Sequence, residues 1–252
     1  MNTAAAASDA DWSQGAIPFE RPAPSRFFVA HAALALGALL WLNWTIVHDV
    51  PLAIKGIGSS YLIFFYHFPS ALNMGVAYTA LMAFSVAYLR TKRPVWDRRA
   101  RAAAEVGFLA NAVLLLTGST WAKAAWNAWW VWNDPRLMSA AVMSLVYVGY
   151  LMLESAIEEP QRRRQISAVY GILAFVNLPV VYYSIQWFGV ASHPMKMDGM
   201  SDPAIKSAKW LSVLLFVPFY LLLYRWSYDR RTRAEHVEDV LQRVRRLEEK
   251  AA

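Results

Sequence analysis

Apolar residues are concentrated in six blocks along the chain, at residues 27–47, 62–89, 103–120, 137–153, 166–188 and 210–224. A helix needs roughly 17–25 residues to cross about 30 Å of hydrocarbon. Most of the blocks are close to this length, and the fourth lies near the lower limit. Backbone groups in hydrocarbon must satisfy their own hydrogen bonds, which favours helices. The pattern therefore predicts an all-α, multi-pass membrane protein with six transmembrane helices.

The segments between the blocks differ sharply in charge. Arginines and lysines are concentrated between blocks two and three, between blocks four and five, and after block six, whereas the other connections carry few. Basic loops remain on the cytoplasmic side of a membrane. We therefore expect both termini to be cytoplasmic, which six crossings allow. The net charge of +7 then favours contact with membrane lipid over nucleic acid.

Three regions are expected from this pattern. Residues 1–25 are rich in alanine, proline and polar residues and predict a mobile tail. Residues 26–225 form the membrane domain, with an outward-facing loop at 118–137. Residues 226–252 are charged, with apolar residues at helical spacing at Val237, Val240, Leu241, Val244 and Leu247. This predicts an amphipathic cytoplasmic helix, which either lies on the inner membrane surface or docks a partner protein.

The outward loop is rich in tryptophan. Five of the twelve tryptophans fall within twelve residues, at Trp121, Trp126, Trp129, Trp130 and Trp132. Tryptophan favours membrane interfaces, but five in one loop exceed what an interfacial belt needs. Trp126, Trp129 and Trp130 stand at helical steps, so we expect them to form one flat wall. Such a wall suits a large planar ligand.

Two histidines are predicted on the same side of the membrane as this loop. His67 lies near the outer end of the second block, and His193 lies just beyond the fifth. Neutral imidazole is a strong iron ligand, and two axial ligands of a porphyrin must come from separate elements. The pair therefore predicts haem b with two axial histidines. His48 is a reserve ligand or, more simply, a solvated residue. The chain has no cysteine, which excludes thiolate ligands and thiol catalysis.

Three further loop residues complete the predicted site. Lys123 and Arg136 are the natural partners of the two haem propionates, although each is equally consistent with an ordinary interfacial cation. Asp134 precedes Pro135 at the start of the fourth block. A carboxylate there caps the helix and fixes the angle at which the loop enters it.

These residues carry a family resemblance. Residues 126–137 resemble the tryptophan-rich "WWD" signature of haem-handling membrane proteins. Other segments fit the same pattern in order and spacing, namely His67-Phe68-Pro69, Thr117-Gly118-Ser119, Ser139, Tyr147-Val148-Gly149-Tyr150 and residues 177–184. Together they cover most of residues 30–225. The chain resembles the cytochrome c maturation protein C family, also called haem exporter protein C.

The resemblance implies a function. Members bind haem at the outer face of the bacterial inner membrane, between the tryptophan-rich loop and two axial histidines, and present it to a periplasmic haem chaperone. An ATP-binding-cassette ATPase with its permease and a small single-span subunit complete the complex, so no catalysis is expected of this chain. By position, His67 and His193 match the axial ligands, and the signature loop is matched by Trp121, Trp126, Trp129, Trp130, Trp132, Asp134 and Arg136.

The sequence departs from the family pattern at three loop positions. Ala122 and Asn127 stand where the family usually has glycine, and Asn133 is an extra residue before Asp134. An extra residue within a helical turn would rotate all later residues of the helix by about 100°. We therefore expect that the insertion is absorbed at the junction with Pro135 or that the haem contacts are rearranged.

Two other functions are weighed against haem presentation. Related cytochrome c synthases share the tryptophan-rich loop and attach haem themselves, but they have more spans and a histidine pair inside the membrane, which this chain lacks. A membrane transporter for haem is the other alternative. Few ionisable residues lie within the six blocks, and a polar pathway would require more of them.

Overall fold

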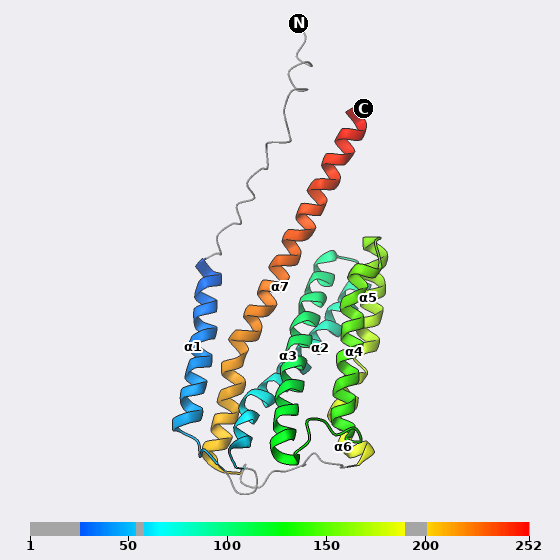
Figure 1. Ribbon diagram of the computed structural model, residues 1–252. Helices are drawn as coiled ribbons and strands as arrows, with labels where there is room; N and C mark the ends of the chain where they lie inside the picture. The colour runs from blue at the N-terminus through cyan, green and yellow to red at the C-terminus, as the bar shows by residue number, and fades with distance from the viewer. Residues whose placement is uncertain (1–25, 54–57, 190–200, 252) are drawn as a thin grey trace.

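The computed structural model describes residues 26–53, 58–189 and 201–251, and these form a helical bundle (Figure 1). The elements are α1 (Arg26–His48), the short 3₁₀-helix η2 (Ser59–Ile63), α2 (Phe64–Thr91), α3 (Pro94–Trp126), α4 (Pro135–Ala156), α5 (Pro160–Ala174), α6 (Asn177–Phe188) and α7 (Pro203–Ala251). The predicted tail at residues 1–25 lies outside the described residues.

Among the described residues, six helical segments are long and apolar enough to cross a membrane, which confirms the predicted all-α fold with six spans. The fourth span is longer than predicted, because α4 begins at Pro135 and continues to Ala156. The fifth is built from two helices, α5 and α6, which are separated at residues 175–176. Pro179 explains this break, because proline donates no backbone hydrogen bond and its ring clashes with the carbonyl four residues earlier.

A carboxylate followed by proline marks the start of three helices. Asp134 accepts hydrogen bonds from the backbone nitrogens of Arg136 and Leu137 at 3.0 and 3.1 Å. The Glu159 carboxylate likewise caps α5, and Asp202 accepts a 2.7 Å bond from the nitrogen of Ala204 at the start of α7. The carboxylate satisfies backbone donors that lack a partner in the helix, and proline suits the first helical position. These local signals explain where α4, α5 and α7 begin.

Helices α2 and α3 form the centre of the bundle and pack together most extensively. They are joined by a tight turn in which Lys92 takes a left-handed conformation (φ 56°) and Pro94 starts α3. Helices α1 and α7 pair on one side, and α4 packs with α5 and α6 on the other (Figure 1). Helix α6 thus contacts α4 at the end of the bundle away from the C-terminal part of α7 (Figure 1).

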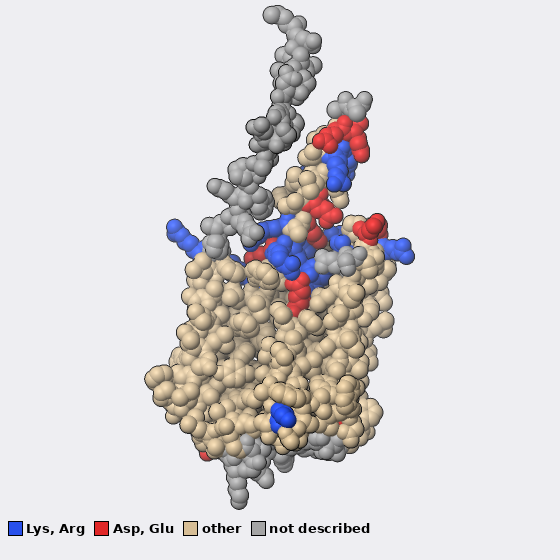
Figure 2. Space-filling view, in the orientation of Figure 1, with Lys and Arg blue, Asp and Glu red and all other residues tan. Residues whose placement is uncertain are grey.

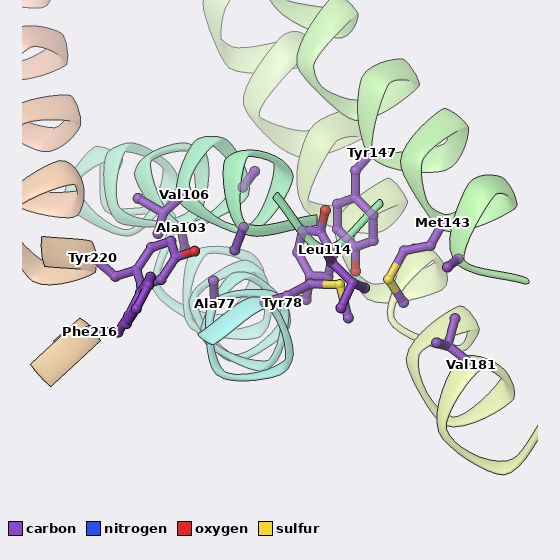
Figure 3. Close-up of a cluster of buried hydrophobic side chains, with 14 of the residues drawn as sticks. Ala77, Tyr78, Ala103, Val106, Leu114, Met143, Tyr147, Val181, Phe216 and Tyr220 are labelled. Atoms are coloured by element: carbon purple, nitrogen blue, oxygen red, sulfur yellow. The ribbon is translucent and has the colours of Figure 1, made fainter. Parts of the chain in front are cut away.

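Aromatic stacking holds α2, α3 and α4 together in the core. The rings of Tyr78 and Tyr147 are stacked, with centroids 3.4 Å apart, and both are fully buried (Figure 3). Gly107 of α3 lies against the Tyr78 ring, where a Cβ atom would fall 2.3 Å from a ring carbon. Asn111 adds a polar link by donating to the hydroxyl of Ser144 at 2.7 Å. These contacts fix how the three helices that carry the site are spaced.

Charged side chains gather at the end of the bundle from which α7 protrudes (Figure 2). Asp97 and Arg101 of α3 form a buried ion pair with a 3.0 Å separation. Glu105, further along α3, pairs with Arg230 at 2.8 Å and also contacts Arg231. The basic connections between α2 and α3 and between α4 and α5 thus lie at the same end as the C-terminal part of α7. The assignment of this end to the cytoplasm stays a prediction from the charge pattern.

Helix α7 continues without a break from the sixth span through the C-terminal segment. The regions that the sequence separated at residue 225 are therefore one helix, which projects beyond the bundle in the direction of the span (Figure 1). The apolar residues of its last turns, from Val237 to Leu247, are between 44 and 66% exposed. Both interpretations of this segment, contact with the membrane surface and docking of a partner protein, stay predictions.

Candidate functional site

A large cavity lies toward the end of the bundle opposite the arginines. Its volume is about 990 Å³, at the upper end of the roughly 300–1,000 Å³ typical of pockets for small molecules and cofactors. His67 from α2, Trp121 from α3, Arg136 from α4 and Trp130 from the connecting segment all line it. Most of the remaining lining is apolar or aromatic and includes Phe64, Phe68, Leu72, Leu115, Leu137, Phe175, Leu178 and Tyr182. The fold thus brings four of the predicted site residues together.

The imidazole of His67 is held by α3. Its Nδ1 lies 3.0 Å from the hydroxyl oxygen of Thr117. That hydroxyl has a single hydrogen, and the carbonyl of Val113 lies only 2.7 Å from it as the acceptor. The Thr117 oxygen therefore accepts from Nδ1–H of His67. A hydrogen bond of this kind fixes which ring nitrogen carries the proton, and leaves the lone pair on Nε2.

Gly118 makes this approach of His67 to α3 possible. A Cβ atom at Gly118 would lie 3.3 Å from the Cε1 atom of His67 and 3.8 Å from its Nδ1. The residue has no side chain, so the imidazole packs directly against the helix backbone. Together, Thr117 and Gly118 set both the tautomer and the position of the ring.

The tryptophans do not form the single wall that helical spacing predicted. Helix α3 ends at Trp126, so residues 118–126 of the predicted loop are helical and Trp129 and Trp130 lie beyond the helix. Trp129 and Trp132 are 60 and 77% exposed, whereas Trp121 and Trp130 line the cavity. The expected wall of Trp126, Trp129 and Trp130 on one helix face is therefore wrong.

Asn127 is the physical reason for this difference. It ends α3 in a left-handed conformation with φ 56° and ψ 21°, which turns the chain away from the helix axis. Glycine and asparagine are the residues that adopt this conformation most readily. Asparagine therefore serves where the family usually has glycine. The other departure, Ala122, is fully buried within α3, where its small side chain is accommodated.

The extra residue Asn133 lies outside both flanking helices. It belongs to a turn in which the nitrogen of Asp134 donates to the carbonyl of Val131 at 3.1 Å. Asp134 is fully buried and caps α4 as predicted. Asn133 therefore adds no residue within a helical turn, which fits absorption at the junction with Pro135, while the arrangement of the haem contacts stays a prediction.

The two predicted cations occupy different places. Arg136 lines the cavity, whereas the Nζ of Lys123 donates to the Oδ1 of Asn127 at 2.8 Å and stabilises the end of α3. The cavity also has an unused donor. The indole Nε1–H of Trp130 is buried and has no acceptor among the described residues. Arg136 and Trp130 can therefore both serve an anionic group of a ligand, while the contact of Lys123 with one stays a prediction.

Two of the other histidines, His48 and His31, lie away from the cavity. His48 ends α1, is exposed and stacks on Trp44 with ring centroids 3.8 Å apart, which fits the solvated residue considered for it. His31 lies 2.9 Å from the carbonyl of Pro218 in α7. His193 lies outside the described residues, so its role as second axial ligand stays a prediction. No cluster of three or more histidine, aspartate or glutamate side chains suited to a metal occurs in the described parts of the chain.

Several lining residues were not predicted from the sequence. Phe64, Phe68, Ala71 and Gly75 share the cavity face of α2 with His67. Apart from Phe68, which is adjacent, they are spaced from His67 at helical steps, which is the signal that could have identified them. The role of Thr117 as the partner of His67 had no such signal, since the two residues are fifty positions apart.

Comparison with known proteins gives a family match and relatives that carry the same name. The sequence model of the family described as Heme exporter protein C matches residues 20–247. The protein of this name from Bradyrhizobium diazoefficiens is 28% identical over 167 residues, which are 66% of this chain and 63% of that protein. The corresponding protein from Escherichia coli K12 is 28% identical over 193 residues, covering 76% of this chain and 78% of that protein.

A plant relative extends the same relationship. A Marchantia polymorpha protein named "Putative cytochrome c biosynthesis ccmC-like mitochondrial protein" is 27% identical over 165 residues, or 66% of this chain and 69% of that protein. The family match spans nearly the whole chain and includes all six spans and the lining of the cavity. The resemblance found in the sequence is thereby confirmed, and the chain belongs to the haem exporter protein C family.

Proposed function

We propose that this protein binds haem as cargo in the large cavity and presents it, at the outer face of the bacterial inner membrane, to a periplasmic haem chaperone during cytochrome c maturation. The observation that carries the proposal is the meeting of His67, Trp121, Trp130 and Arg136 at one cavity of about 990 Å³. These residues come from separate elements, and the cavity lies away from the arginine-rich end. Membership of the haem exporter protein C family supports the nature of the cargo.

The donor set of the cavity fits haem. Haem supplies an iron that accepts two axial ligands, a planar apolar ring and two carboxylates. Imidazole at His67 suits the iron, and the aromatic and aliphatic lining suits the ring. Arg136 and the unused indole N–H of Trp130 suit carboxylates, because a buried donor without an acceptor is costly until a ligand supplies one. Haem b is therefore the cargo that we propose.

We propose that His67 and His193 are the two axial ligands. His67 is on α2, and His193 comes after α6 in the chain, so the two residues come from different elements. Thr117 keeps the Nδ1 of His67 protonated, so in this proposal Nε2 is the nitrogen that binds iron. Trp121 and Trp130 offer their faces and edges to the ring. Trp126, Trp129 and Trp132 do not line the cavity, and we propose that they contact the exposed part of the haem or the chaperone.

The remaining parts of the proposal concern orientation and partners. We propose that the arginine-rich end is cytoplasmic by the positive-inside rule, so that the cavity opens toward the periplasm. ATP hydrolysis would belong to an ABC-type ATPase with its permease, and a small single-span subunit would complete the complex. In this scheme the protein holds and positions haem and catalyses no reaction.

Co-purification tests the proposed function. Membranes containing this protein, a periplasmic haem chaperone and an apocytochrome c should yield the protein together with haem-loaded chaperone. A variant with Arg136→Gln should hold less haem and recover less loaded chaperone, because the carboxylate partner is lost. Recovery of apocytochrome with newly attached haem in place of the chaperone would contradict presentation and support the synthase alternative.

A conservative change at Thr117 tests how His67 is positioned. Thr117→Val keeps the shape of the side chain but removes the acceptor of Nδ1–H, so we expect haem affinity to fall by about 10–100-fold, as for other outer-shell partners of metal ligands. The haem that remains should have a lower proportion of the low-spin spectrum. Haem titration with visible spectroscopy measures both quantities.

Thr120→Val is the matched control for this change. Thr120 is on the same helix, is exposed and bonds the carbonyl of Leu116 within its own helix, at 2.8 Å. This variant should bind haem as the wild type does. Equal haem affinity and spectra in the two valine variants would show that the Thr117 hydroxyl does not position His67.

A further inference from the structure

A second, smaller pocket lies at the arginine-rich end of the bundle. Its volume is about 270 Å³, and its lining includes Arg98 and Arg101 of α3, Arg163 of α5 and Arg230, Arg231 and Glu235 of α7. Five guanidinium groups thus face two carboxylates, since Glu238 also belongs to the lining. The pocket joins three helices that are far apart in sequence, at the level where the apolar surface gives way to charge (Figure 2).

Three carboxylates in or near this pocket, those of Glu235, Asp97 and Glu105, are already paired. Glu235 contacts Arg98 at 2.6 Å and Arg164 at 3.2 Å. Arg101, which is only 5% exposed, is held by Asp97 at 3.0 Å. Glu105 pairs with Arg230 at 2.8 Å. These carboxylates are therefore neutralised within the protein, and the pocket keeps a surplus of positive charge.

Two donors in the pocket lack an acceptor. The Nε–H groups of Arg98 and Arg163 are buried, and no acceptor for either lies among the described residues. Leaving a buried donor on a charged group unpaired is costly. Arg163 is also placed beside several like charges, which destabilises the protein unless an anion is bound. Both features point to an anionic ligand.

We propose that this pocket binds a phosphate group, and that the group is carried by the headgroup of an anionic membrane lipid. Guanidinium groups match the geometry of phosphate oxygens, and basic pockets between membrane helices bind anionic headgroups. A volume of about 270 Å³ admits a headgroup but not a helix of a partner protein. The position at the end of the spans places the pocket where headgroups lie. This inference is independent of the proposed haem function.

Arg163→Gln distinguishes an empty pocket from one that binds a lipid phosphate, because the two predict changes of melting temperature in opposite directions. If the pocket binds no anion, the substitution relieves repulsion and should raise the melting temperature in any membrane. If a lipid phosphate binds, it should lower the melting temperature in nanodiscs that contain phosphatidylglycerol and leave it unchanged or raised in pure phosphatidylcholine. Native mass spectrometry of the full-length protein should also show about tenfold weaker retention of phosphatidylglycerol in the variant.

Two controls accompany this test. One asks whether any cation at this end has the same effect, and the other asks whether free phosphate can replace the lipid. The double variant Arg90→Gln/Arg93→Gln removes two cations near the same end that do not line the pocket and should retain phosphatidylglycerol as the wild type does. Inorganic phosphate added to phosphatidylcholine nanodiscs should stabilise the wild type far less than the lipid. Equal stabilisation by inorganic phosphate would overturn the lipid as its source.

Other results would overturn the whole proposal. If phosphatidylglycerol stabilises the wild type and Arg163→Gln equally, the pocket holds no lipid phosphate. If neither protein responds to the lipid but an acidic partner subunit stabilises only the wild type, the surplus charge serves a protein contact instead.

Discussion

Replacing His67 with alanine should remove the low-spin haem spectrum from the purified protein. His67 lines the cavity on the α2 side, and its Nδ1 lies 3.0 Å from the Thr117 hydroxyl, so Nε2 is the nitrogen that we propose as the iron ligand. Loss of an outer-shell partner already lowers metal affinity by about 10–100-fold, and loss of the ligand itself should exceed this. The haem-to-protein ratio and the visible spectrum after expression in haem-competent cells measure the effect.

His48→Ala is the matched control for this prediction. His48 is exposed at the end of α1 and does not line the cavity, so its removal should leave the haem content unchanged. His193→Ala should abolish the low-spin spectrum as His67→Ala does, because a bis-histidine haem needs both ligands. An unchanged spectrum in both the His67 and the His193 variant would refute the assignment of the axial ligands.

Gly107→Ala should destabilise the bundle strongly for so small a change. The added Cβ would lie 2.3 and 2.5 Å from two carbons of the Tyr78 ring. That ring has no room to retreat, because it is fully buried and stacks on Tyr147 at 3.4 Å (Figure 3). Overpacking of a well-filled core costs about 1–3 kcal/mol. The melting temperature in detergent should fall, and haem content should fall with it, since α2, α3 and α4 carry the cavity.

Gly37→Ala provides the same chemical change in a different environment. Gly37 is on α1, and a Cβ atom there would meet nothing within 4 Å. Alanine favours helix over glycine by about 1 kcal/mol, so this variant should be unchanged or slightly more stable. If both alanine variants melted at the same temperature as the wild type, the close packing of Gly107 against Tyr78 would be disproved.

The sequence predicted the spans well because the signal for them is local. Block length and apolar content are set by the thickness of the membrane, so six spans were expected, and six candidate spans occur among the described residues. The cap of α4 and the start of that helix at Pro135 were also readable, because aspartate followed by proline satisfies the free backbone donors of the first helical turn. The split of the fifth span between α5 and α6 was not predicted, although Pro179 marks it.

The tryptophan-rich segment shows where local reasoning failed. Periodicity placed Trp126, Trp129 and Trp130 on one face, but a single left-handed residue, Asn127, ends the helix before two of them. The propensity of asparagine for this conformation is visible in the sequence, yet whether it is adopted depends on the surrounding packing. The place of Asn133 could not be predicted for the same reason, and the structure puts it in the turn before Asp134, outside both helices.

By itself the sequence determined that this is a six-span helical membrane protein of a haem-handling family, with cations gathered in some connections and tryptophans in another. The spans, the basic connections and the tryptophan-rich motif can be recognised because each depends only on residues that are close together in the sequence. Only the tertiary structure decided which tryptophans line the cavity, that Thr117 holds His67 and that arginines from three helices share one pocket. These contacts join residues tens of positions apart, and close packing such as that of Gly107 on Tyr78 sets the distances between them.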